Sequence, residues 1–135
     1  MTNAPILPAP LLRQALLADA VTTAACAALL IGGAGILDDL LGLPAGLLRG
    51  AGLVLVPFVA LVSWLGTRQR LPRMMILAVI GLNILWVIDS VLLLVGGWAA
   101  PTAAGLAFVI AQAVAVAMYA ELQIIGLRRS TTALA

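Results

Sequence analysis

Asp19 and Asp89 each lie within a long stretch of apolar residues. A carboxylate in such a setting is costly unless it is paired or hydrated, so it is a functional candidate by default. Asp19 also belongs to a weakly polar stripe at helical spacing that continues through Thr23 and Cys26. Asp19 and Asp89 are therefore the candidates for binding a proton or a cation.

Asp89 has polar and aromatic neighbours at helical spacing. Asn83, Trp86 and Ser90 share its helix face. A second stripe of polar and aromatic residues lies along one face of the last apolar stretch. Small-molecule pockets are typically lined by aromatic walls with a few convergent polar groups. The candidate ligand-binding residues are Asn83, Trp86, Asp89, Phe108, Gln112 and Tyr119.

The depth of Asp89 allows two interpretations. In an antiparallel helix pair, residues at equal distances from the connecting turn lie at similar depths, and Asp89 mirrors Gln112 around the turn near Pro101. A hydrogen-bonded clasp between these two side chains would hold the helices together. A ligand or proton site is the alternative.

Around the turn at Leu43, the same comparison of depths places two acidic residues level with arginines. Asp19 mirrors Arg68, and Asp38 mirrors Arg49. These coincidences predict two ion pairs, one at each edge of the membrane. The alternative for Asp19 is a proton-binding or cation-binding carboxylate.

The composition excludes several kinds of chemistry. Histidine is absent, all seven basic residues are arginine, and Cys26 is the only cysteine. His-based triads, HExxH zinc sites, lysine Schiff bases and CxxC redox pairs are therefore impossible. We expect no catalytic residues, no cofactor and no metal site, and hence a protein that is not an enzyme.

The elements that position these residues are membrane helices. The chain has 135 residues, of which 64% are hydrophobic and 9% charged, with a mean hydropathy of +1.23. A membrane crossing needs about 20 apolar residues, and four stretches qualify, at about 16–37, 50–66, 74–95 and 102–127. Their connections are short, which predicts one all-α domain over residues 1–135, an antiparallel up-down bundle of four transmembrane helices.

Arginine placement predicts the orientation of this bundle. Six of the seven arginines, all except Arg49, fall on one face of the predicted topology. Arginine-rich loops stay on the cytoplasmic side, so we expect a multi-pass inner-membrane protein with both termini in the cytoplasm. The arginines are divided among three separate segments, which indicates topology marking and no nucleic-acid partner.

Small residues predict where helices approach closely. Such contacts can lie within one chain or between chains, so a homo-oligomer or a membrane-protein partner is compatible with them. We further expect the segments 1–10 and 130–135 to fray, Trp98 to lie at the membrane surface, and Pro57 to kink its helix. The small-residue positions are Gly32, Gly33, Gly35, Ala107, Ala111 and Ala115.

Several segments together resemble a group of small uncharacterised bacterial inner-membrane proteins. They are LGLPA at 41–45, VPF at 56–58, NILWV at 83–87, GW at 97–98 with PT at 101–102, and GLRR at 126–129. The resemblance implies a location in the inner membrane and a four-helix architecture. It carries no catalytic residue to this chain.

The segment LADAVTT at 17–23 resembles the first helix of small multidrug-resistance transporters. In that family an acidic residue in a similar setting binds the substrate cation or a proton, which implies such a role for Asp19. The sequence departs from the family in having aspartate in place of glutamate and in lacking aromatic-rich second and third helices. Its arginine asymmetry also differs from the dual insertion that some members use.

Two functions follow from these observations. The first is a non-enzymatic membrane protein that binds a lipid or a small apolar molecule, or a membrane partner, within its four-helix bundle. The alternative is a proton-coupled exporter of small cations, for which Asp19 or Asp89 must reach an aqueous path. Both functions place the protein in a lipid bilayer.

Overall fold

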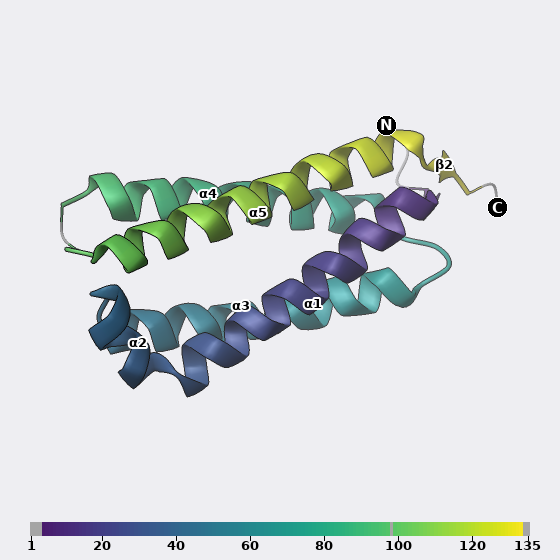
Figure 1. Ribbon diagram of the computed structural model, residues 1–135. Helices are drawn as coiled ribbons and strands as arrows, with labels where there is room; N and C mark the ends of the chain where they lie inside the picture. Colours follow the sequence, from purple (N-terminus) through teal and green to yellow (C-terminus); the bar gives the residue numbers. More distant parts are fainter. Residues whose placement is uncertain (1–3, 98, 134–135) are drawn as a thin grey trace.

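The computed structural model describes residues 4–97 and 99–133 and is almost entirely helical (Figure 1). Four of its helices are long and apolar enough to cross a membrane, so the chain is a multi-pass membrane protein with an all-α transmembrane bundle, as predicted. The helices are α1 (Pro10–Gly32), α2 (Ala34–Leu41), α3 (Ala45–Thr67), α4 (Arg73–Val95) and α5 (Ala103–Arg129). Two short strands, β1 (Ile6–Leu7) and β2 (Thr131–Thr132), lie near the chain ends.

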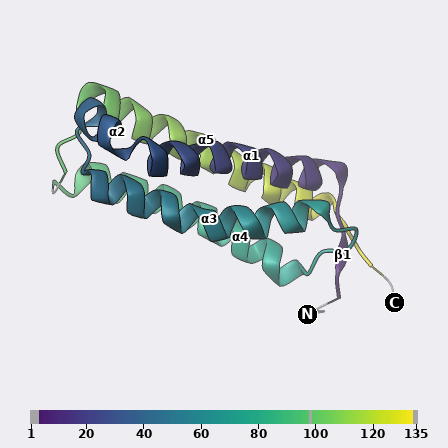
Figure 2. The same ribbon diagram turned by 90° about the horizontal axis from the view of Figure 1, so that it is seen from below.

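A single helix was predicted for the first apolar stretch, residues 16–37, but the structure has two helices there. α1 ends at Gly32, and α2 begins at Ala34 with a new direction at the end of the bundle opposite the termini (Figure 2). Gly33 links them, and a Cβ at this position would lie 2.8 Å from the Leu29 carbonyl oxygen. The hydropathy pattern continues through this break because both pieces are apolar.

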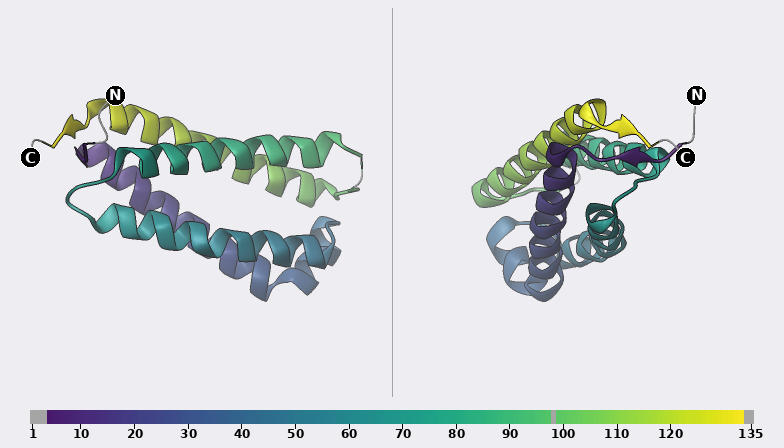
Figure 3. Two further views of the ribbon diagram at one scale, coloured as in Figure 1. Left: turned by 180° about the vertical axis from the view of Figure 1, so that it is seen from behind. Right: turned by 90° about the vertical axis from the view of Figure 1, so that its right-hand side faces the viewer.

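Helix α1 is the central element of the bundle. It crosses the molecule diagonally and packs against α3 and α5, while α4 packs against α5 (Figure 3). The consecutive helices α3 and α4 make few contacts with each other. α3 and α4 are consecutive in the up-down bundle, but α1 and α5 provide most of the contacts that hold these two helices in place.

Close helix approaches occur at glycines other than the predicted ones. A Cβ on Gly52 would lie 2.7 Å from Ile31 Cγ1, and one on Gly126 would lie 2.7 Å from the Leu12 backbone. Gly105 packs directly on the Leu41 carbonyl group. These three glycines let α1, α2, α3 and α5 approach to backbone contact.

The small-residue faces predicted at 32–35 and 107–115 are mostly not packing faces. A Cβ on Gly32 or Gly35 would meet no atom within 4 Å, and Ala107 and Ala111 are exposed. A small residue permits close approach only where its helix face is turned toward a neighbour. The spacing of small residues along one helix does not contain that information.

The described parts of the two chain ends are tied together. Ile6 pairs with Thr132 in the short antiparallel sheet, and it exchanges backbone hydrogen bonds of 2.8 and 2.9 Å with Leu71. The Ala133 N–H donates to the Pro5 carbonyl at 2.8 Å. The predicted fraying is therefore wrong for these residues, and both ends close the bundle beside the α3–α4 loop. Trp98, predicted at the membrane surface, lies outside the described residues.

Candidate functional site

Two adjoining cavities lie among α1, α3, α4 and α5, with volumes of about 370 and 580 Å³. The smaller cavity is toward the end of the bundle that carries α2, and the larger one extends toward the termini. Both cavities lie beside the α3–α4 pair, whose helices make few contacts with each other. We call the two cavities together the hollow. Both are lined by Cys26, Leu47, Ala51, Trp86, Asp89 and Gln112.

The structure places all six candidate ligand-binding residues on the wall of the hollow. Phe108 lines the smaller cavity, and Asn83 and Tyr119 line the larger one. Trp86 and Gln112 line both cavities, as does Asp89. The helical spacing therefore identified side chains that do converge, and they line a hollow to which α1, α3, α4 and α5 all contribute.

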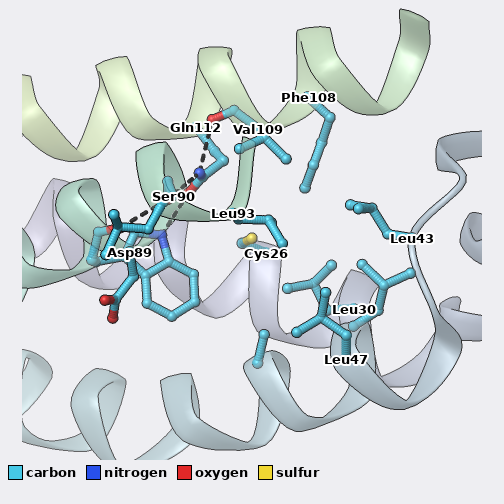
Figure 4. Close-up of a pocket in the computed structure, with 14 residues that line it drawn as sticks. Cys26, Leu30, Leu43, Leu47, Asp89, Ser90, Leu93, Phe108, Val109 and Gln112 are labelled. Atoms are coloured by element: carbon cyan, nitrogen blue, oxygen red, sulfur yellow. Dashed lines mark hydrogen bonds between the residues drawn. The ribbon is translucent and has the colours of Figure 1, made fainter. Parts of the chain in front are cut away.

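Gln112 holds α5 to α4 through Trp86 and Ser90 (Figure 4). The Trp86 indole N–H donates to Gln112 Oε1 at 2.6 Å, and Gln112 Nε2 donates to Ser90 Oγ at 2.9 Å. Ser90 Oγ donates in turn to the Trp86 carbonyl at 2.8 Å, and Gln112 Nε2 also donates to the Val109 carbonyl at 2.8 Å. A polar clasp exists at the predicted depth.

Asp89 is not a member of this clasp, so the predicted pairing of Asp89 with Gln112 is wrong. Trp86 and Ser90 are four residues apart and share one helix face, which α4 turns toward α5. Asp89 is exposed, and its carboxylate points away from α5 into the hollow (Figure 4). Equal depth was correct here, but depth does not determine which face a residue occupies.

Asp19 is fully buried, with 0% of its surface exposed, and it joins α1, α4 and α5. Its Oδ1 accepts from the Thr23 hydroxyl at 2.9 Å. Its Oδ2 accepts from Asn83 Nδ2 at 2.9 Å and from Gln123 Nε2 at 2.8 Å, and Asn83 Nδ2 also donates to Gln123 Oε1 at 3.0 Å. We call Asp19, Thr23, Asn83 and Gln123 the Asp19 cluster.

The predicted ion pairs of Asp19 and Asp38 are replaced by other contacts. The Arg68 guanidinium lies over the Trp64 ring, 5.0 Å from its centroid, and the donors to Asp19 come from neutral side chains. Asp38 Oδ2 accepts the Ala45 backbone N–H at 3.1 Å, which stabilises the first turn of α3. Hairpin symmetry misassigned Asp19 because α1 also packs against α5, which is distant in sequence, and it misassigned Asp38 because the carboxylate accepts from the backbone at the start of α3.

Gln123 and Asn83 are the partners of Asp19 that the sequence prediction missed, whereas Thr23 was already placed on the same stripe as Asp19. A signal for this grouping was present in the positions along the helices. Asp19 lies 9 residues from the start of α1, Asn83 lies 10 from the start of α4, and Gln123 lies 6 from the end of α5. All three helix ends are at the terminal side of the bundle, so comparing depths across all helices would have brought these residues together.

The Asp19 cluster forms part of the wall of the larger cavity. Thr23 and Asn83 line that cavity, whereas Asp19 behind them has no exposed surface. Another hydrogen bond in the same region joins Thr22 of α1 to Tyr119 of α5, with 2.6 Å between the hydroxyl oxygens. Within residues 4–97 and 99–133, no group of three or more His, Cys, Asp or Glu residues is arranged to hold a metal ion.

Comparison of the chain with protein families, with curated proteins and with solved structures finds no match. The geometry of the hollow and the chemistry of its wall are therefore the features that bear on function.

Proposed function

We propose that this membrane protein is not an enzyme and binds a lipid or a small apolar molecule in the hollow. The observation that supports this function is the size and lining of the two cavities, about 370 and 580 Å³ with mostly apolar walls. Ligand pockets typically have volumes of about 300 to 1,000 Å³ and similar linings. Because α3 and α4 make few contacts with each other, we infer that a molecule enters the hollow between them from the surrounding bilayer.

The placement of the arginines supports a location of the protein in the inner membrane. Six arginines lie at the end of the bundle that carries both termini, in α1, the α3–α4 loop, the first turn of α4 and the last turn of α5. By the positive-inside rule this end faces the cytoplasm of a bacterial cell and the protein lies in the inner membrane. A membrane-protein partner or a second copy of the chain, inserted between α3 and α4, is the competing occupant of the hollow.

Filling the hollow tests the proposal. Ala51 lies on the wall shared by both cavities, so Ala51→Phe places a ring where the ligand would bind. We expect the affinity for 1-decanol, measured by calorimetric titration of the protein in nanodiscs against empty nanodiscs, to fall about tenfold or more, equivalent to about 1.4 kcal/mol. Ala60→Phe is the matched control, because Ala60 is on the same helix, is exposed and does not line the hollow. Equal decanol binding by all three proteins would contradict a ligand site in the hollow.

A proton-coupled exporter of small cations is the second candidate, and the exposed carboxylate of Asp89 in the hollow favours it. In proteoliposomes with an imposed pH gradient, this candidate predicts that Asp89→Asn abolishes uptake of tetraethylammonium. Asp19→Asn is the companion variant, since Asp19 lies behind the cavity wall. Uptake that is unchanged in both variants would eliminate carboxylate coupling.

A further inference from the structure

Asp89 differs from the other polar residues on the wall of the hollow in lacking a partner. Thr22 and Tyr119 bond to each other, and Thr23 and Asn83 bond to Asp19. The polar side chains of Trp86, Ser90 and Gln112 bond within their clasp. Among the described residues, no side chain donates a hydrogen bond to the Asp89 carboxylate, and this carboxylate is the only charged group lining either cavity.

We infer that the ligand of the hollow is a cationic amphiphile, whose positively charged group binds at Asp89 and whose apolar part fills the larger cavity. This inference rests on the proposed function and adds the ligand class. A carboxylate in an apolar setting is costly without a countercharge, and a bound cation supplies one. A neutral ligand could donate a hydrogen bond to Asp89 but would leave its charge uncompensated, and an anionic ligand would be repelled.

The surroundings of Asp89 suit a substituted ammonium group. Trp86 lies three residues before Asp89 on α4 and lines the same two cavities, and the face of an indole ring attracts cations. The indole N–H is already donated to Gln112, so the ring is held in place by α5. Trp86 and Asp89 thus present an aromatic surface and a negative charge at one point of the hollow.

The position of Asp89 along α4 also suits an amphiphile that enters from the bilayer. Asp89 lies six residues before the end of α4 at Val95, which is about 9 Å at 1.5 Å per residue. The larger cavity extends from there toward the middle of the span, along Val54, Phe58 and Leu82. An amphiphile in the leaflet at the α2 end of the bundle has this orientation, because its charged group lies near the membrane surface and its chain is directed to the bilayer centre.

The test compares three ten-carbon probes that differ in their polar group. Decyltrimethylammonium, 1-decanol and decanoate are titrated into the protein in nanodiscs, with empty nanodiscs as the background. We expect the wild-type protein to bind the ammonium probe at least about tenfold more tightly than decanol, and decanoate most weakly. We expect Asp89→Asn to bind the ammonium probe and decanol with about equal affinity, while Asp89→Glu retains most of the preference for the ammonium probe.

Asp39→Asn is the control for a general charge effect, because Asp39 is an exposed acid on α2 that does not line the hollow. Its preference for the ammonium probe is expected to equal that of the wild-type protein. If the ammonium probe and decanol bind with equal affinity and Asp89→Asn changes neither, the ligand class is wrong and the apolar site stands. If no probe binds saturably to the wild-type protein, the proposed function itself fails.

Discussion

Replacing Asp19 with alanine is expected to lower the free energy of unfolding by about 3 kcal/mol. The substitution removes the acceptor of the Thr23 hydroxyl and of the Asn83 and Gln123 amides. A buried donor without an acceptor costs about 1 to 3 kcal/mol, and three donors lose their acceptor together. Titration with sodium dodecyl sulfate, followed by circular dichroism of the protein in mixed micelles, measures the change.

Asp19→Asn separates the loss of hydrogen bonds from the loss of charge. The asparagine oxygen can accept from Asn83 and Gln123 in the place of Asp19 Oδ2, and its amide can donate to Thr23 Oγ1. We therefore expect this variant to lie within about 1 kcal/mol of the wild-type protein, since single membrane hydrogen bonds average about 0.6 kcal/mol. An alanine variant as stable as the wild type would show that the Asp19 cluster does not hold the bundle together.

The transmembrane helices were predictable because hydropathy and length decide them. α3, α4 and α5 differ from the predicted ranges by a few residues, mostly at ends where an arginine or a proline begins or ends the helix. The break at Gly33 was not predictable in this way. The residues on both sides of the break are equally apolar. The close contacts of Gly33 with Leu29 and Leu37 are visible only in the folded structure.

The members of the candidate site were predictable, but their partners were not. Helical spacing groups Trp86 and Asp89 on one side of α4, yet about 100° of rotation separates Asp89 from Ser90, and this decides which residue meets Gln112. Asp19 was paired with Arg68 on hairpin symmetry, which considers only helices adjacent in sequence. The contact of α1 with α5 brings Gln123 to Asp19 from 104 residues away.

The arrangement of helices that brings Gln123 to Asp19 also explains the hollow. α1 is covered by α3 and α5, and α4 is held by α5, so α3 and α4 are both positioned without packing on each other. The space between them forms the hollow, whose polar wall consists of side chains that have hydrogen-bond partners and of Asp89, which has no such partner among the described residues. A packing arrangement that no local pattern in the sequence specifies is thus the origin of the candidate site.

Replacing Gly126 with leucine is expected to destabilise the bundle by at least about 3 kcal/mol, because it forces α5 away from α1. The added Cβ would lie 2.7 Å from both Leu12 Cα and Leu12 N, which are backbone atoms that cannot move aside independently. Overpacking of this kind costs about 1 to 3 kcal/mol even where side chains can adjust, and here a whole helix must shift. The same detergent titration measures the loss of stability.

The shift also has a local consequence that distinguishes it from general unfolding. Ser130 Oγ donates to the Gly126 carbonyl at 2.8 Å and accepts from the Ala9 N–H at 2.9 Å, so moving α5 releases the tied chain ends. We expect hydrogen exchange at the Ile6 and Ala133 amides to become faster. Gly81→Leu is the control, since Gly81 is exposed on α4 and a Cβ there meets no atom within 4 Å. If both leucine variants were equally stable, the α1–α5 contact would not be the tight one that holds Asp19 against Gln123.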